Sequence, residues 1–148
     1  MSKVAIYLNF LGNTEDAFNY YKSVFGTEFS APLMRIKDMP PHPNAPALSE
    51  ADLNSVMHVA LPIIGGIELM GTDMLESMGH KLIVGNNTTI SLQLDSKDEA
   101  DKLFNALSEG GTDKAAMRDE FWGYWGCCLD KFGIRWMFNV MNATQPNA

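Results

Sequence analysis

The chain has 148 residues, of which 46% are hydrophobic and 20% are charged. This composition is typical of a globular domain with a sizeable core and not of a disordered chain. A formal net charge of -7, without a stripe of Lys and Arg, argues against a nucleic-acid partner because acidic surfaces repel phosphate groups.

The first half of the chain predicts a strand, a helix and three further strands. Apolar residues alternate at about 4–10, as in a strand, but this run is too short to cross a bilayer and no signal peptide is visible. We therefore expect no membrane association. A helix should follow, with Thr14 as its N-cap and Gly26 after its last turn. Its expected apolar face consists of Ala17, Tyr20, Tyr21 and Val24. The other strands are expected at about 27–35, 57–63 and 67–72, with Gly65 and Gly66 forming a tight turn.

The second half repeats this order. Its helix is expected between Ser96, as N-cap, and Gly110, with an apolar face at matching positions. This face consists of Ala100, Leu103, Phe104 and Leu107. The strands are expected at about 88–95, 113–118, 124–129 and 134–140. When Gly66 is aligned with Gly133, Met70 aligns with Met137, and a duplicated module is the simplest explanation.

We therefore expect a single domain, 1–148, made of two modules at about 1–73 and 87–143, with a linker at 74–86. A proline-rich loop at 36–55 interrupts the repeat. Loops of this length in compact domains usually act as lids, binding loops or interfaces, and the sequence leaves these three roles open.

The repeated modules and two segments, HVALPIIGGIELMGTD and the FWG to DKFGIRWMFN stretch, resemble the vicinal oxygen chelate superfamily. This superfamily includes glyoxalase I, bleomycin-resistance proteins and extradiol dioxygenases. Within it, the chain is most similar to the PhnB-like branch, whose members often carry the name 3-demethylubiquinone-9 3-methyltransferase. The resemblance implies an α+β fold of two βαβββ modules whose curled mixed sheets enclose one pocket. It also implies a homodimer, in which the modules pair either within one chain or between two.

Metal-dependent members of this superfamily place His, Gln or Glu on the first and last strands of each module. The matching positions here are Ala5 (or Ile6, with the gap placed differently), Met70, Thr89 and Met137. These side chains do not suit a hard metal ion. Glu68, on the face of Met70, offers one carboxylate, and His42 and His80 lie in loops without a second ligand nearby in sequence. We therefore expect no metal and no cofactor.

Other enzyme classes have less support. A nucleotide-dependent methyltransferase would need a Gly-rich turn between a strand and a helix, whereas the glycines here fall in hairpins and at helix ends. A nucleophile pair formed by Cys128 and His58 has no supporting motif.

If the positions that bind metal in relatives face inward, strand alternation predicts the pocket lining. This lining mixes apolar and polar groups, which suits a small organic molecule. Alternation selects Tyr7, Asn9, Glu68, Met70, Thr89, Ser91, Gln93, Arg135, Met137 and Asn139. The candidate lining also includes His58, Trp122, Tyr124 and Cys128. Trp122, Tyr124 and the methionines either form apolar walls or belong simply to the core or to an interface. The opposite set should pack beneath the helices: Ile6, Leu8, Phe10, Ile90, Leu92, Leu94, Trp136 and Phe138.

Several lining residues have two interpretations. His58 either pairs at the sheet edge or acts as a hydrogen-bonding group or weak base. Arg135 either lies at the surface near a turn or binds an anionic group through its planar fork. A two-residue turn in the last hairpin would pair Cys128 with Arg135 and direct Cys128 to the pocket. A bulge at Gly133 would instead set Cys127 opposite Met137.

The two adjacent cysteines also bear on location. Neighbouring strand residues point to opposite faces, so Cys127 and Cys128 are not expected to form a disulfide, and reduced thiols are typical of a cytoplasmic protein.

The leading functional hypothesis is a metal-free protein that binds a small molecule for sequestration or sensing. The alternatives are a lyase- or dioxygenase-like enzyme that uses side chains or a non-standard metal site, and a partner-binding protein with a collapsed cavity.

Overall fold

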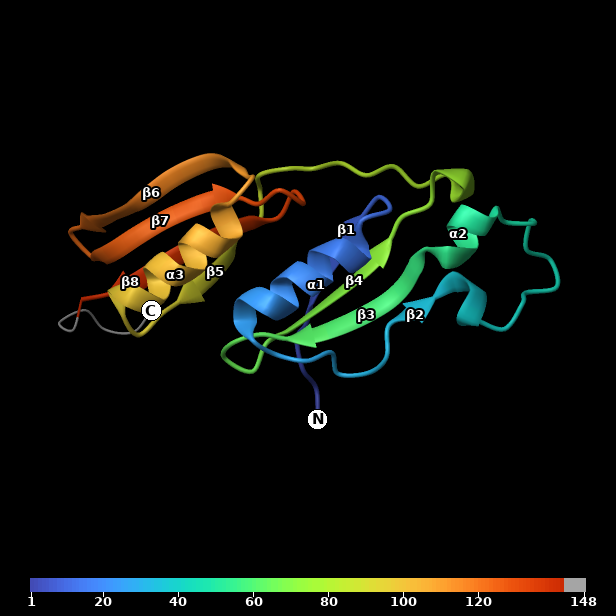
Figure 1. Cartoon of the computed structure of the whole chain (residues 1–148), viewed down its shortest axis with the longest axis horizontal. Helices are drawn as coiled ribbons and strands as arrows, with labels where there is room; N and C mark the ends of the chain where they lie inside the picture. Colours follow the sequence, from blue (N-terminus) through green and yellow to red (C-terminus); the bar gives the residue numbers. More distant parts are fainter. Residues whose placement is uncertain (143–148) are drawn as a thin grey trace. The chain divides into compact units, whose positions relative to one another are not determined.

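The structure is a computed structural model that describes residues 1–142. The chain divides into two compact units, Met1–Ile83 and Val84–Ala148 (Figure 1). Each unit contains a four-stranded sheet and a helix of 12 residues. Within residues 1–142, no helix has the length and apolar character needed to cross a membrane.

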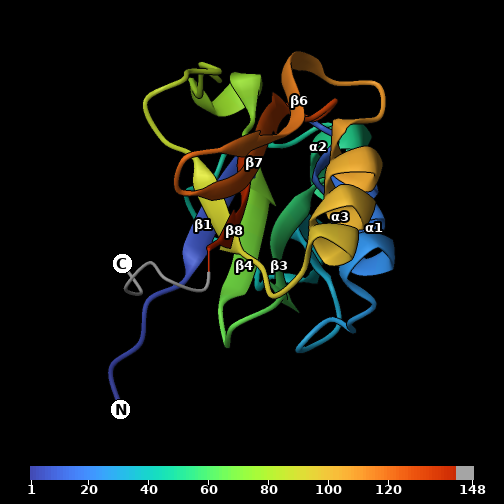
Figure 2. The same cartoon turned by 90° about the vertical axis from the view of Figure 1, so that its left-hand side faces the viewer.

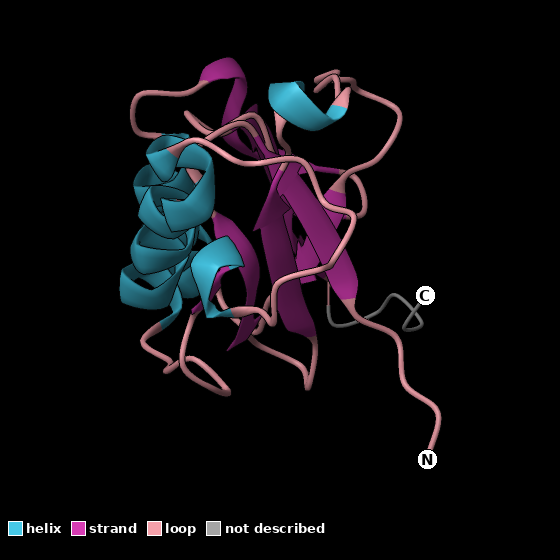
Figure 3. Cartoon of the chain, turned by 90° about the vertical axis from the view of Figure 1, so that its right-hand side faces the viewer, coloured by secondary structure: helices cyan, strands magenta, loops and turns pink. Residues whose placement is uncertain are grey.

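The first unit has a mixed sheet with the strand order β1-β4-β3-β2. Its strands are β1 (Ile6–Phe10), β2 (Met34–Arg35), β3 (Val56–Pro62) and β4 (Glu68–Asp73). Strand β4 pairs parallel with β1 and antiparallel with β3. Helix α1 (Thr14–Phe25) packs against one face of this sheet, as Figures 1 and 3 show. The short helices are η1 (Ile36–Asp38), α2 (Glu50–Asn54) and η2 (Glu76–Met78).

Helix α1 begins differently from the prediction. Asn13 is its N-cap and Thr14 is its first residue, because the Thr14 hydroxyl donates to Asp73 Oδ1 at 2.6 Å instead of capping the helix. Gly26 ends the helix in the left-handed conformation, as predicted, and its N–H donates to the Lys22 carbonyl. Phe18 is fully buried and belongs to the apolar face, although it was not assigned to it.

The expected strand at 27–35 forms regular strand pairing only at Met34–Arg35. The preceding residues follow the edge of β3 irregularly: the Ser30 N–H donates to the Ala60 carbonyl and the Thr27 hydroxyl donates to the Pro62 carbonyl. Pro32 lies within this stretch and has no N–H, so it cannot continue a ladder of hydrogen bonds. The prediction of a long second strand is therefore wrong.

The second unit repeats the topology of the first, with the strand order β5-β8-β7-β6. Its elements are β5 (Ile90–Gln93), α3 (Lys97–Ser108), β6 (Thr112–Glu120), β7 (Gly123–Leu129) and β8 (Arg135–Met141). Strand β6 forms one edge of the sheet, and its pairing with β7 shifts register twice. The Ser96 hydroxyl accepts the Glu99 N–H, which confirms the predicted N-cap.

Helix α3 lies along one face of its sheet (Figure 2). Apolar residues fill the layer between them. Trp136 and Phe138 are fully buried there, and the Phe104 ring lies edge-on to the Phe138 ring at 5.6 Å between centroids. The residues predicted to lie beneath the helices are buried at six of eight positions, and Ile6 and Ile90 are half-buried. Strand alternation was therefore sufficient to identify the helix-facing side of each sheet.

The last hairpin adopts the register predicted for a bulge at Gly133, where φ is 91°. Cys127 pairs with Met137, and Cys128 pairs with Trp136. The Asp130 carboxylate organises the turn, because Oδ1 accepts the N–H groups of Phe132 and Ile134. The register therefore places Cys128 on the side that α3 covers.

Candidate functional site

The face of the first sheet opposite α1 carries polar side chains from three strands. The register sets Tyr7 beside Met70, and Asn9 beside Thr72. Tyr7 Oη and His58 Nδ1 are 3.1 Å apart, which is a hydrogen-bond distance, and their ring centroids are 5.8 Å apart. His58 therefore has a side-chain partner on the predicted site face, and both interpretations of this residue remain compatible with the contact.

Glu68 lies on the same face and is held as a carboxylate. The Ser30 hydroxyl donates to Glu68 Oε2, and Lys3 Nζ lies 3.4 Å from Oε1. The Ser30 hydrogen bond is the main reason that the pKa of Glu68 is lowered. Burial opposes it with a smaller effect, and Lys3 lowers the pKa further. Ser30 was not recognised in the sequence, because it comes from the irregular segment that replaces the expected second strand.

The corresponding face of the second sheet carries a continuous chain of hydrogen bonds. The Trp122 indole donates to Asn139 Oδ1 at 3.0 Å, and the Asn139 amide donates to Gln93 Oε1 at 2.9 Å. The Gln93 amide in turn donates to the Ser91 hydroxyl at 2.7 Å. The structure thus brings together four of the residues that strand alternation and the tail motif singled out.

Two predicted lining residues lie on the opposite side of this sheet. Cys128 is fully buried beside Trp136, and burial, with a smaller effect of Asp130, raises the pKa of its thiol to about 12. Tyr124 donates its hydroxyl to Asp101 of α3 at 2.7 Å, and this hydrogen bond is the main reason that its pKa is raised. Both assignments are wrong, because the hairpin register directs even-numbered residues of β7 to the helix.

Cys127 and Trp125 occupy the site face in their place. Cys127 pairs with Met137, and Trp125 pairs with Asn139. The Arg118 guanidinium carbon lies 5.1 Å from the centre of the Trp125 ring. The signal that could have identified these residues was Gly133, whose positive φ permits the turn that sets this register.

The positions that carry metal ligands in relatives do not form a metal site. Met70 lies beside Tyr7, Met137 lies beside Ser91, and Thr89 is an exposed residue just before β5. Within residues 1–142, no three His, Cys, Asp or Glu side chains are grouped so that they could hold a metal ion. Thioether and hydroxyl groups are poor ligands for hard divalent ions, so these positions do not fit the metal that relatives use.

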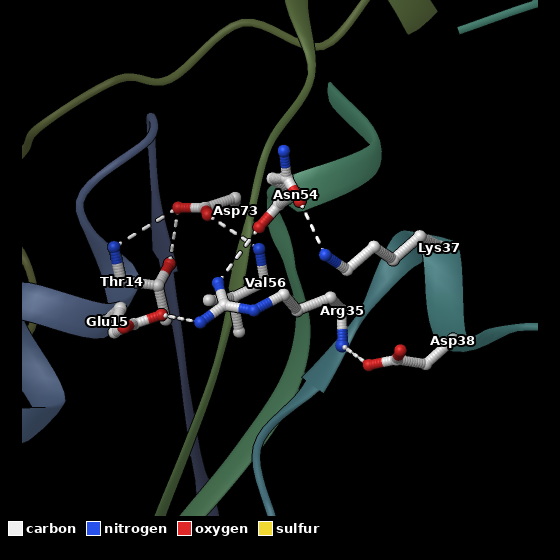
Figure 4. A network of polar contacts seen from close by, with 8 residues as sticks. All are labelled: Thr14, Glu15, Arg35, Lys37, Asp38, Asn54, Val56 and Asp73. Carbon is white, nitrogen blue, oxygen red and sulfur yellow. Dashed lines mark hydrogen bonds and ion pairs between the residues drawn. The ribbon is translucent and has the colours of Figure 1, made fainter. Parts of the chain in front are cut away.

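A second polar cluster, in the first unit, connects the loop at 36–55 to the fold (Figure 4). The Asp73 carboxylate accepts hydrogen bonds from Gly12 N–H, from the N–H and hydroxyl of Thr14, and from Val56 N–H. Arg35 lies 2.5 Å from Glu15 of α1 and donates to the Asn54 carbonyl at 3.0 Å. These contacts fasten both ends of the loop, and the carboxylate oxygens of Asp73 are occupied by the protein's own donors.

Two units, each with a mixed sheet and one covering helix, give the chain the fold of the glyoxalase/bleomycin-resistance/dioxygenase proteins. Solved proteins of this class match almost the whole chain. A model of the family described as 3-demethylubiquinone-9 3-methyltransferase matches residues 2–139, and the chain belongs to this family. The α+β fold and the PhnB-like branch expected from the sequence are thereby confirmed.

Three relatives illustrate the match. Protein YjdN from Escherichia coli (strain K12) is 31% identical over 150 residues, which cover 95% of each chain. The crystal structure of protein PA1353 from Pseudomonas aeruginosa has a TM-score of 0.80 and 31% identity, covering 95% of this chain and 98% of that one. A PhnB protein from Bacillus cereus has a TM-score of 0.73 and 22% identity, covering 94% and 99%.

Proposed function

We propose that the protein binds a small organic molecule, without a metal ion, on the face of the second sheet opposite α3. The observation that carries this proposal is the hydrogen-bonded chain of Trp122, Asn139, Gln93 and Ser91. Fixed polar groups of this kind orient a ligand, and the neighbouring side chains of Met137 and Cys127 offer apolar contact. Sequestration or sensing of the ligand is the role that such a site supports.

An NMR fragment screen tests this proposal, because each tryptophan indole gives its own signal. Bound fragments should shift the Trp122 indole resonance but not that of Trp136, whose indole donates to Asp130 beneath α3. Gln93→Ala should weaken binding, whereas Asn105→Ala, on an exposed position of α3, should not. Fragments that bind without affecting Trp122, or equally to both variants, would contradict the proposed site.

Metal analysis provides a separate test. Protein purified without a chelator should contain less than one equivalent of zinc, nickel, manganese or iron, because methionine occupies two of the aligned ligand positions. Added metal should not strengthen fragment binding. A stoichiometric metal that enhances binding or turnover would refute the metal-free part of the proposal.

The Tyr7–His58 hydrogen bond favours a second candidate function, a metal-independent enzyme that transfers protons. A phenol in contact with an imidazole can pass a proton to or from a ligand, as general acid–base catalysis requires. Carbonyl compounds identified as binders should then exchange carbon-bound hydrogen in deuterated water. Tyr7→Phe and His58→Gln should abolish this exchange, whereas His42→Gln, in the exposed loop, should leave it intact. Exchange that survives both of the first two variants would exclude this candidate.

The family name suggests methyl transfer, but the two strand-to-helix turns give this activity no support. The turn between β1 and α1 contains Gly12 alone, and the turn between β5 and α3 contains no glycine. A nucleotide-type cofactor would need a Gly-rich turn at such a place. We therefore do not propose methyl transfer.

We also propose a cytoplasmic homodimer that binds neither nucleic acid nor membrane. The free thiols of Cys127 and Cys128 support a reducing location, and the net charge of -7 disfavours phosphate-rich partners. Light scattering coupled to size-exclusion chromatography should give twice the mass of 16.4 kDa. A single-chain mass at micromolar concentration would contradict the dimer.

A further inference from the structure

Arg135 stands out among the polar residues of the second sheet because its guanidinium group has no close partner in the part of the chain that the structure describes. The side chain is only 21% exposed. Its Nε atom is buried and has no hydrogen-bond partner among residues 1–142. Buried donors are nearly always paired, and donors on a charged group are the most costly to leave unpaired. A buried guanidinium N–H of this kind therefore points to a partner other than the residues that the structure describes.

The nearby carboxylates do not neutralise this charge well. Asp113 Oδ2 lies 3.8 Å from Arg135 Nη1, at the outer limit of an ion pair, and the Asp113 side chain is 68% exposed. Exposed pairs at such distances contribute little. The Asp130 carboxylate, at the adjoining turn, already accepts two backbone N–H groups and the Trp136 indole N–H.

The other arginines show the contrast. Arg35 Nη2 lies 2.5 Å from Glu15 Oε2, and Arg35 Nη1 donates to the Asn54 carbonyl. Arg118 Nε lies 2.6 Å from Glu120 Oε1, and the Arg118 guanidinium group stacks over the Trp125 ring. These two guanidinium groups have the close protein partners that Arg135 lacks.

The position of Arg135 connects it with the proposed ligand site. It is the first residue of β8, and alternation places it on the same face as Met137 and Asn139. Ser91 lies beside Met137 in the parallel pairing of β5 and β8. From the ordinary strand spacing and rise, the Cα atoms of Arg135 and Ser91 are about 8 Å apart. Arg135 and the end of the hydrogen-bonded chain therefore belong to the same face of one sheet.

We propose that Arg135 binds the oxyanion of a small organic acid, a carboxylate or a phosphate ester, through Nε–H and one terminal N–H. This inference rests on the proposed small-molecule-binding function and names the chemical class of the ligand. The planar guanidinium group presents two parallel N–H donors that match the spacing of two oxyanion oxygens. The ligand's uncharged part would lie along Met137 towards Ser91.

Three probes with one phenyl ring and different head groups test the proposal: benzoate, phenyl phosphate and benzamide. Titrations followed by NMR should show that the two anions shift the Arg135 Nε–H resonance and bind more tightly than benzamide. Comparison of benzoate with phenyl phosphate identifies the preferred oxyanion. Arg135→Gln should weaken anion binding by about tenfold to a hundredfold, the range of a charge-assisted hydrogen bond, and leave benzamide binding unchanged.

Lys102→Gln is the matched control, because it removes a cation of the same unit from an exposed position of α3, which covers the other face of the sheet; anion binding should be unchanged. Arg135→Lys keeps the charge and guards against loss of the fold, but it lacks the planar fork and should bind the anions severalfold more weakly. Anion affinity that is unchanged in Arg135→Gln or Arg135→Lys overturns the proposal, as does failure of both anions to bind. If benzamide binds as tightly as the anions and shifts the Trp122 indole resonance, the proposed role of Arg135 is overturned, but the proposed binding of a small molecule to this sheet is supported.

Discussion

Replacement of Asp73 by alanine should destabilise the first unit strongly. This carboxylate accepts hydrogen bonds from two buried backbone N–H groups, those of Thr14 and Val56, at 3.1 and 2.8 Å. A buried donor left without a partner costs about 1–3 kcal/mol, so the two together predict a loss of about 2–6 kcal/mol in the free energy of unfolding. Since domains are stable by only about 5–15 kcal/mol, this is a large fraction of the total.

Equilibrium unfolding in urea, followed by far-ultraviolet circular dichroism, measures this loss. With a urea dependence of about 2 kcal/mol per molar, a loss near the middle of the range lowers the midpoint by about 2 M. Circular dichroism is the suitable signal because all three tryptophans lie in the second unit. Asp73→Asn should fall between wild type and Asp73→Ala, because it keeps one acceptor oxygen and turns an N–H₂ group towards a donor.

Asp16→Ala is the control, since Asp16 is exposed in the first turn of α1 and contributes at most about 1 kcal/mol through the helix dipole. If Asp73→Ala and Asp16→Ala unfold at the same urea concentration, the reasoning about the buried donors is refuted.

Three further predictions concern single positions. Gly71→Ala should cost about 1–3 kcal/mol in urea unfolding, because a Cβ there would lie 2.5 Å from the Phe18 ring; unchanged stability would show that the ring can move aside. Alkylation by iodoacetamide at pH 8, mapped by mass spectrometry, should spare Cys128 in the folded protein and modify it in urea, since burial raises its pKa to about 12; rapid modification of the folded protein would contradict this. Ser30→Ala should raise the pKa of Glu68 in an NMR titration, because it removes the hydrogen bond that lowers this pKa. The variant should be less stable than wild type above the ordinary carboxyl pKa of about 4.3, and this difference in stability should vanish as the pH falls through the lowered pKa of Glu68. An unchanged pKa would show that Ser30 is not its cause.

The sequence predicted the features that depend on periodicity. Alternation in the strands separated residues such as Phe138, beneath the helix, from Met137 on the other face, because side chains of a strand alternate strictly. The internal repeat placed Met70 and Met137 at equivalent positions in the two sheets. These patterns are local or repeated, so they can be read without knowledge of the tertiary contacts.

Features that depend on a turn or on distant residues could not be predicted in the same way. The choice between Cys127 and Cys128 depended on the conformation of a single turn, which two hydrogen-bonding patterns could satisfy. The role of Asp73 depends on partners up to 61 residues away in the sequence, and no local pattern reports such a contact. Thr14 is suited to capping a helix, and only the position of Asp73 diverts its hydroxyl.

The edge strand β6 has a consequence for how copies of this protein meet in solution. An exposed strand edge offers unpaired N–H and C=O groups to the edge of another molecule, which can lead to aggregation. Five of the nine residues of β6 are charged, namely Asp113, Lys114, Arg118, Asp119 and Glu120, and its two register shifts interrupt the regular ladder that an incoming strand would extend. The charges and the irregular pairing thus disfavour the addition of a strand from another molecule at this edge. Variants that neutralise the charges while preserving the fold should form sheet-rich aggregates at concentrations where the natural chain stays dispersed.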